Sequence, residues 1–302
     1  MINTVLGQIN ESEVKSALSH EHITCYCDFM SLMSGEKYID KAEVEKAAVS
    51  HLIYMREKYG LNLFLDCTPA NIGRDVELMK RVSEKSGVHI VCSTGLYYTY
   101  NPIIAPMSAE NIAEHYIRDA KNINAGIIKA AVEEEKISEF NEKLLVASAI
   151  AHKEIELPIV VHTNGRNENG RKALEILLEN GASPESVVIG HIGGSGNADY
   201  ICEMAQKGCY VAFDRLPAVA SEEYLENKVA IIERLCEAGF GEKILLSHDA
   251  MYFTGFSSEH KIQPEPRFEF VYKNLLPRLD ASLADTIMRK NPVSMLKCKR
   301  NG

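Results

Sequence analysis

Histidine recurs at the ends of short apolar, β-branched runs of the kind that form strands. The first run ends in His20-Glu21-His22, and because side chains alternate along a strand, both imidazoles can point to one side. Taken singly, His162 or His191 is interpreted as a hydrogen-bonded residue at a strand end, and paired histidines such as His20 and His22 also occur by chance on strands. Neutral imidazole and carboxylate together, however, suit divalent transition metals. Four histidines and one aspartate stand at the ends of four expected strands. Together they predict a metal site made of His20, His22, His162, His191 and Asp249.

A lysine stands in a run of the same character, Gly126-Ile127-Ile128-Lys129. A charged ammonium buried beside a dication is strongly disfavoured. Two chemical states fit better: a Schiff base, as in barrel aldolases, or a carbamate formed with carbon dioxide, whose two oxygens can bridge two metals. The nearby histidines favour the carbamate, since an aldolase has no need of them. A lysine that merely extends out of the fold fits less well, because Lys129 is close to the C-terminal end of its run.

The elements that must position these residues alternate between strand and helix. Eight strands are expected, each followed by a segment of helical length, and their spacing is about that of one βα unit. Eight such units predict a single (β/α)8 barrel over residues 1–302, with its active site at the C-terminal ends of the strands. A doubly wound open sheet is the competing fold, but no Gly-x-Gly-x-x-Gly follows an early strand. The expected strands are 17–22, 62–67, 88–94, 126–132, 157–162, 186–191, 208–213 and 243–248.

Composition narrows the class of protein. The 302 residues carry a formal charge of -9, which disfavours nucleic acid and anionic membranes as partners. No apolar run is long enough to span a membrane, and the N-terminus lacks the pattern of a secretory signal. The eight cysteines are scattered, which favours reduced thiols. We therefore expect a soluble cytoplasmic protein that acts on a small molecule.

The ordered set of metal-site residues resembles the phosphotriesterase-related family of the amidohydrolase superfamily, in particular its lactonase branch. The likeness extends from Asn3-Thr4-Val5-Leu6-Gly7 and Leu18-Ser19-His20-Glu21-His22 to Asn291-Pro292, so it covers nearly the whole chain. It implies that His20, His22 and Asp249 bind one metal and that His162 and His191 bind the other. Lys129, as N6-carboxylysine, would bridge the two ions. Zinc is the expected metal, with manganese and cobalt as alternatives, and the family also suggests a homodimer.

Two further residues match the pocket of the lactonases. Tyr97 follows the third expected strand and Arg215 the seventh, where the family places side chains beside the metals and the lactone. Their structural alternatives are a tyrosine that caps the core and a surface ion pair between Arg215 and Asp214. The loop cations Arg166, Lys261 and Arg267 are further candidates for contact with an anionic substrate, without an assigned role.

The leading hypothesis is hydrolysis of a lactone or similar carboxylic ester, including a phosphorylated or anionic one, by a hydroxide that bridges two metals. Asp249 would accept the proton of that hydroxide, and Lys129 would complete the centre. A phosphotriester and an N-acyl amide are the alternative substrates. A Schiff-base aldolase acting through Lys129 and a non-catalytic binding protein are the alternatives of a different class.

Overall fold

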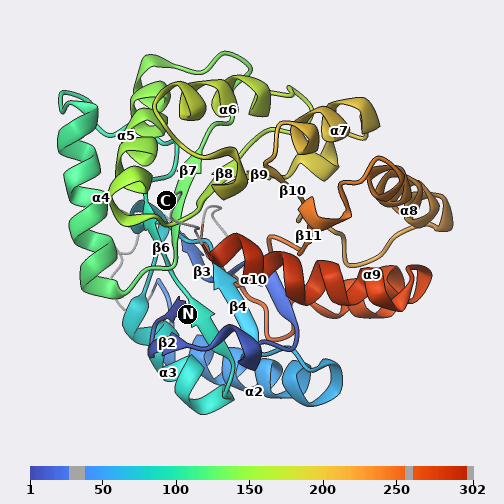
Figure 1. Ribbon diagram of the computed structural model, residues 1–302. Coiled ribbons are helices and arrows are strands. Elements are labelled where there is room, and N and C mark those ends of the chain that lie inside the picture. The colour runs from blue at the N-terminus through green and yellow to red at the C-terminus, as the bar shows by residue number, and fades with distance from the viewer. Residues whose placement is uncertain (27–37, 256–260, 298–302) are drawn as a thin grey trace.

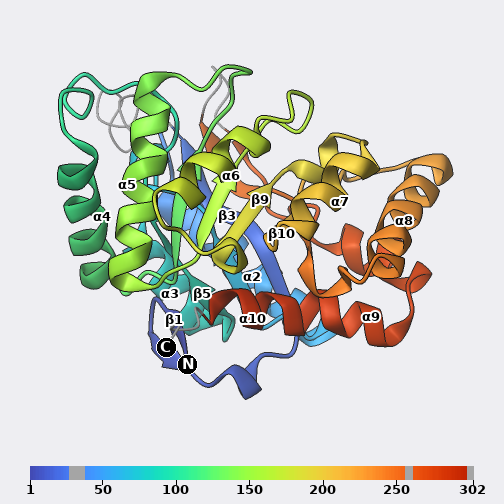
Figure 2. The same ribbon diagram turned by 45° about the horizontal axis from the view of Figure 1, so that its top comes forward.

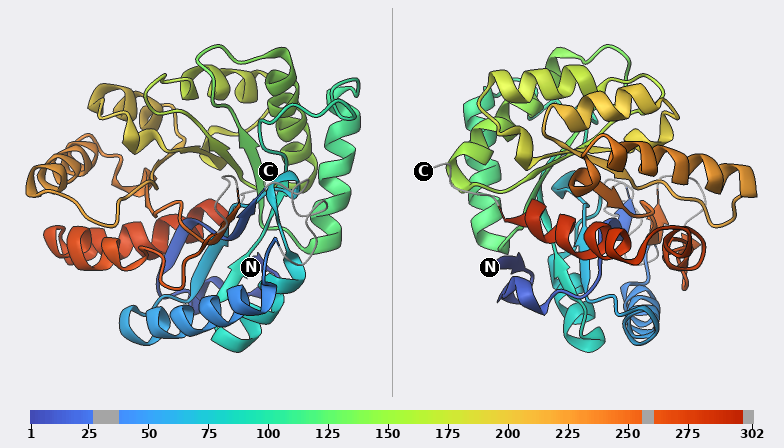
Figure 3. Two further views of the ribbon diagram at one scale, coloured as in Figure 1. Left: turned by 180° about the vertical axis from the view of Figure 1, so that it is seen from behind. Right: turned by 45° about the vertical axis from the view of Figure 1, so that its right-hand side comes forward.

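The computed structural model describes residues 1–26, 38–255 and 261–297. Short parallel strands alternate with helices along the chain, and the helices lie outside the strands (Figure 1). A view from behind and one from the side show the same arrangement (Figure 3). Each of the eight expected strands is present, and the segment expected at 88–94 forms two shorter strands.

Two sheets make up the ring of strands. One has the strand order β11-β10-β9-β8-β7-β6 and the other the order β13-β12-β3-β4-β5. The sheets adjoin where Cys92 separates β5 from β6, and again between β11 and β12. At the second junction, Ser247 N donates to Phe213 O and Asp249 N donates to His20 O, which continues the ring. The strands are β1 (Ile2–Thr4), β2 (Gly7–Ile9), β3 (Ala17–Tyr26), β4 (Leu63–Asp66), β5 (His89–Val91), β6 (Ser93–Gly95), β7 (Ile127–Ala131), β8 (Ile159–His162), β9 (Val187–Gly190), β10 (Tyr210–Phe213), β11 (Ile244–Leu246), β12 (Met251–Gly255) and β13 (Lys261–Ile262).

Side-chain caps fix where the long helices begin. The Asp40 carboxylate accepts hydrogen bonds from two backbone N–H groups at the start of α2, and Ser108, Ser138 and Ser221 cap three later helices. Gly60 ends α2 in a left-handed conformation that favours glycine. The helices are α2 (Lys41–Tyr59), α3 (Val76–Ser86), α4 (Ala109–Ile123), α5 (Glu139–Ile155), α6 (Gly170–Glu179), α7 (Ala198–Gln206), α8 (Glu222–Glu237), α9 (Ala281–Asp285) and α10 (Asn291–Leu296).

Alternating strand residues build two apolar layers. One layer lies inside the ring and the other between the strands and the helices. The β1–β2 hairpin and α10, which lie at the same end of the ring (Figure 2), contribute Ile2, Ile9, Met295 and Leu296 to the inner layer. That end is therefore closed by apolar side chains. The inner layer includes Leu63, Leu65, Val91, Ile127, Val160, Val188, Ala212 and Leu245.

A bulge in β3 decides which of its side chains face inward. The register between β3 and β4 shifts between Leu18 and Glu21. Before the shift, Ala17 belongs to the inner layer and Leu18 to the outer one; after it, Ile23 belongs to the outer layer. The shift therefore moves the even-numbered residues His20 and His22 to the inside, as bulges commonly do near functional sites.

The described part of the chain contains neither a disulfide nor a membrane-spanning helix. Cys25, Cys67, Cys92, Cys202, Cys209 and Cys236 are free. Among the described residues, no helix has the length and apolar character needed to cross a membrane.

Candidate metal centre

The six predicted ligand side chains meet at the C-terminal ends of the strands. They are His20 and His22 on β3, Lys129 on β7, His162 at the end of β8, His191 after β9 and Asp249 after β11. All are buried except the Asp249 side chain, which is 18% exposed. Residues separated by more than two hundred positions in the sequence thus share one buried, polar space.

His20, His22 and Asp249 form a group that can hold a metal ion. The Nε2 atom of His22 lies 3.0 Å from Asp249 Oδ1, and Nε2 of His20 lies 3.7 Å from the same oxygen. Two imidazoles and a carboxylate that converge in this way are typical of zinc and similar ions.

A second group of donor atoms lies beside the first. His191 Nε2 is 2.9 Å from His162 Nδ1 and 3.8 Å from the other Asp249 oxygen, Oδ2. Lys129 Nζ lies 2.9 Å from His20 Nε2 and is buried. The two oxygens of Asp249 thus face the two groups of imidazoles separately. The donor set fits a centre with two metal ions.

The imidazoles of His20 and His162 are suited to ligation because they are uncharged at neutral pH. Burial, together with the charge of Lys129, lowers the pKa of His20 to about 3. Burial also lowers the pKa of His162 to about 3. Burial opposes the ionisation of Asp249, but His191 and His22 outweigh it and hold its pKa well below the ordinary range. Neutral imidazoles and an ionised carboxylate are the states that bind metals.

Each histidine is oriented by a further group. Asp214, which is completely buried after β10, accepts from Nδ1 of His20 at 2.6 Å and from Nδ1 of His191 at 2.9 Å. Glu133 Oε2 lies 2.7 Å from His162 Nε2, and Thr68 Oγ1 lies 2.8 Å from His22 Nδ1. Such partners orient metal ligands and set their tautomers.

These orienting groups were not among the residues predicted from the sequence. Asp214 follows an expected strand and Glu133 follows another, so their position at strand ends was the available signal. The alternative interpretation of Arg215, a surface ion pair with Asp214, was wrong. Arg215 Nε lies 3.0 Å from Asp249 Oδ2, and Asp214 is hydrogen-bonded to the imidazoles of His20 and His191.

Asp214, His20 and His191 also have the composition of a metal site. Their nitrogen-to-oxygen distances of 2.6 and 2.9 Å are those of hydrogen bonds. The Nε2 atoms of the two rings face other predicted ligands, Asp249 in the case of His20 and His162 in the case of His191, whereas Nδ1 of each ring faces Asp214. This group is therefore a hydrogen-bonded support for the predicted metal ligands.

The turn that carries Asp249 is held by Glu21, which stands between the two histidines of β3. Both carboxylate oxygens of Glu21 accept hydrogen bonds from the turn, including those from His248 N, His248 Nδ1 and Ala250 N. Arg267 donates to His248 O at 2.7 Å on the other side. Asp249 itself has a φ of 52°, a left-handed conformation that is uncommon for a residue with a side chain.

The predicted pocket residues border this centre. The Tyr97 ring is 5.1 Å from the His162 ring, and burial raises the pKa of Tyr97, so its hydroxyl remains a hydrogen-bond donor. Arg215 contacts Asp249. Of the three loop cations, Arg166 and Lys261 are exposed, whereas Arg267 is engaged with backbone carbonyls.

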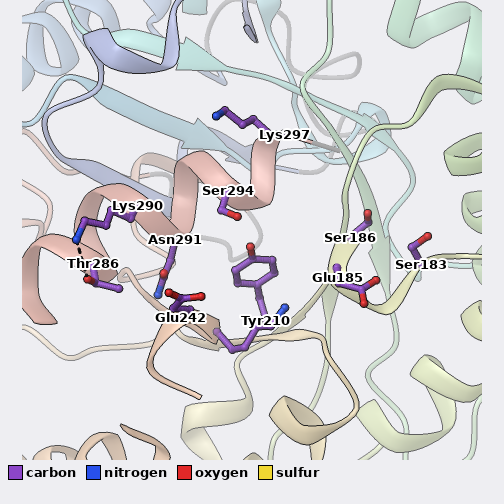
Figure 4. Close-up of a pocket in the computed structure, with 11 residues that line it drawn as sticks. Ser183, Glu185, Ser186, Tyr210, Glu242, Thr286, Lys290, Asn291, Ser294 and Lys297 are labelled. Carbon is purple, nitrogen blue, oxygen red and sulfur yellow. Dashed lines mark hydrogen bonds between the residues drawn. The ribbon is translucent and has the colours of Figure 1, made fainter. Parts of the chain in front are cut away.

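A separate cavity of about 540 Å³ lies at the opposite end of the strands (Figure 4). Ser186, Tyr210 and Lys243, at or just before the starts of β9, β10 and β11, line it together with Asn291 and Ser294 of α10. In barrels of this kind, that end contributes to stability, and catalytic residues gather at the other.

The fold and the two groups of ligands define a metal-dependent hydrolase built on a (β/α)8 barrel. Residues 1–296 match the family described as "Phosphotriesterase family", and the chain belongs to that family. Its members are binuclear metal hydrolases with this barrel, so the predicted family and fold are confirmed.

Curated relatives agree with this assignment. An aryldialkylphosphatase of Saccharolobus solfataricus is 29% identical and covers 94% of this chain and 95% of its own length. A phosphotriesterase homology protein of Mycobacterium tuberculosis is also 29% identical, over 92% of this chain and 90% of its own. The human N-acetyltaurine hydrolase is 26% identical, over 99% and 98%.

Proposed function

We propose that the protein hydrolyses a lactone or a similar carboxylic ester at a centre of two divalent metal ions, most simply zinc. The observation that supports two ions is the placement of Asp249, whose Oδ1 faces His20 and His22 while Oδ2 faces His191. His20, His22 and Asp249 would hold one ion, and His162 and His191 the other.

Two metal ions held by these residues would supply hydroxide at neutral pH and would polarise the scissile carbonyl or phosphoryl oxygen. Asp249 is placed to accept the proton released during attack, because its carboxylate is ionised and partly open to solvent. Arg215 donates to Asp249 Oδ2 and so holds that oxygen in position.

Lys129 is proposed to carry a carbamate that bridges the two ions. Its Nζ is buried and contacts His20 Nε2, a proposed metal ligand. Two dications with four neutral imidazoles and one carboxylate leave excess positive charge, which a carbamate reduces and an ammonium increases.

The ester preference is proposed from Tyr97, which lies beside His162, and Arg215, which contacts Asp249. A tyrosine hydroxyl and a guanidinium can contact the ring and the carbonyl or carboxylate of a lactone. The names of the relatives favour two competing substrates, an aryl phosphotriester and an N-acyl amide.

A substrate panel tests this proposal. Purified, metal-loaded protein is assayed against lactones, sugar-lactone phosphates, N-acyl amides and aryl phosphotriesters, and its metal content is measured in parallel. We expect about two metals per chain and the highest kcat/KM with a lactone. A higher value with an N-acyl amide or a phosphotriester would replace the lactone in the proposal.

A Schiff-base aldolase is the alternative for Lys129. Borohydride reduction with a carbonyl substrate would trap a covalent adduct at Lys129 in an aldolase and none in the proposed hydrolase.

The proposal also includes a cytoplasmic location and a homodimer. Cell fractionation tests the location, and light scattering tests the oligomeric state.

A further inference from the structure

Asp214 is the one described carboxylate that contacts two of the proposed metal ligands through their outer nitrogens. Its Oδ2 lies 2.6 Å from His20 Nδ1, and its Oδ1 lies 2.9 Å from His191 Nδ1. Oδ1 also accepts the backbone N–H of His191 at 2.7 Å. The side chain is fully buried, so water does not compete for these oxygens.

These contacts define the tautomers of both imidazoles. An ionised carboxylate only accepts hydrogen bonds, so His20 and His191 must each carry a proton on Nδ1. Nε2 of each ring then has a free lone pair, and both Nε2 atoms face other proposed ligands: that of His20 faces Asp249 Oδ1, and that of His191 faces His162.

The two rings belong to different metal groups. His20 lies with His22 and Asp249, whereas His191 lies with His162. Resting on the proposed two-metal centre, we propose that Asp214 is a shared positioning residue that prepares one ligand of each metal ion at the same time. Loss of this single carboxylate would therefore weaken the binding of both metal ions.

Two other orienting groups each serve one ligand and provide matched controls. Thr68 Oγ1 donates to Thr24 O, so it accepts from His22 Nδ1 and supports the first ion only. Glu133 contacts His162 Nε2 and leaves Nδ1 of that ring for the second ion.

Zinc titration of chelator-stripped full-length protein tests the proposal. In Thr68→Ala and in Glu133→Ala, one of two zinc affinities should fall by about 10–100-fold while the other is kept. In Asp214→Ala, both should fall by about that factor. Weakening of only one ion, or of neither, in Asp214→Ala would overturn the proposal.

Asp214→Asn gives a sharper result, because an amide has one accepting oxygen and one NH2 group. The oxygen should stay with His191, whose backbone N–H cannot reverse its direction. The NH2 group would then face His20 Nδ1 and move the proton of His20 to Nε2. The zinc ion held by His20 is identified as the one whose affinity falls in Thr68→Ala. In Asp214→Asn, the affinity for this ion should therefore fall more than the affinity for the other ion. The opposite order would contradict the assignment.

Nitrogen-15 NMR of the histidines in the zinc-free wild-type protein keeps the proposal testable if the Asp214 variants do not fold. His20 and His191 should both be protonated at Nδ1 and His162 at Nε2. A proton on Nε2 of His20 or His191 would overturn the proposal. Fewer than two zinc ions on the wild-type protein would instead contradict the two-metal centre, while the NMR result would still test the role of Asp214.

Discussion

At the scale of single residues, Asp249 combines a shared contact with a strained backbone conformation. Its carboxylate faces imidazoles of both metal groups, and its backbone adopts a left-handed conformation at the end of a strand. An acceptor with one oxygen toward each group is suited both to ligation and to proton transfer.

Asp249→Asn should reduce kcat by at least about 100-fold, because the neutral amide is a weak ligand and a poor proton acceptor. Steady-state kinetics on the preferred substrate and metal analysis of the same sample would measure this. Near-normal turnover with two metals bound would remove Asp249 from the mechanism.

Lys129→Ala should lose both metals or bind them weakly, because the proposed carbamate supplies an anionic bridge. A small carboxylic acid should partly restore activity by occupying the vacated space, whereas a neutral alcohol of similar size serves as the control. Carbon-13 NMR of metal-loaded wild-type protein prepared with labelled bicarbonate should show a carbamate signal. An unmodified amine with two metals bound would contradict the proposal.

At the scale of elements, β3 and the turn between β11 and β12 form a unit. The bulge in β3 brings His20 and His22 inward and leaves Glu21 facing that turn. Glu21 is fully buried and accepts four hydrogen bonds from Ser247, His248 and Ala250. The His-Glu-His sequence therefore supplies two proposed ligands and the clamp for a third.

Glu21→Gln should destabilise the protein by about 1–3 kcal/mol, because an NH2 group replaces an oxygen that accepts buried hydrogen bonds. Urea unfolding measures this loss, and activity should fall with it as the Asp249 turn loosens. The matched control is Glu242→Gln, an exposed residue, which should be neutral. Wild-type stability and activity in Glu21→Gln would show that the clamp is dispensable.

At the scale of the whole molecule, closure of the ring brings distant loops to one site. Tyr97 follows β6 and Arg215 follows β10, yet both border the donor groups. Arg215→Ala and Tyr97→Phe should each change discrimination between lactones by about 1–3 kcal/mol, an effect far larger than any change in metal content. Ratios of kcat/KM for a panel of lactones measure this. Equal losses on every substrate together with metal loss would identify both residues as structural supports.

Closure of the ring of strands also brings α2 into contact with Glu269 in the C-terminal part of the chain. Glu269 accepts hydrogen bonds from Tyr54 and Tyr59 of α2, and also from Lys273. Burial opposes its ionisation, but the bonds from Lys273 and Tyr59 outweigh it and lower the pKa of Glu269 from 4.5 to about 2.

Because the pKa is lowered in the folded protein, ionised Glu269 stabilises the fold above about pH 4.5, and this contribution disappears as the pH falls through about 2. Glu269→Gln should lose no more than about 1 kcal/mol at pH 7, since the site is partly exposed. Unfolding measured from pH 7 downward should show the two proteins converging in acid. A constant difference at all pH values would assign the effect to packing.

The sequence by itself determined the eight strands and the residue types at their ends, because strand formation and side-chain alternation depend on near neighbours. The predicted ligands His20, Lys129, His162, His191 and Asp249 do lie close together in the folded chain. The tertiary structure alone decided their partners: Asp214 meets His20 across 194 positions, and Glu21 meets the Asp249 turn across more than 220. It also decided that a bulge turns His20 inward. Such contacts depend on the curvature and register of the closed ring, which local residue pattern does not specify.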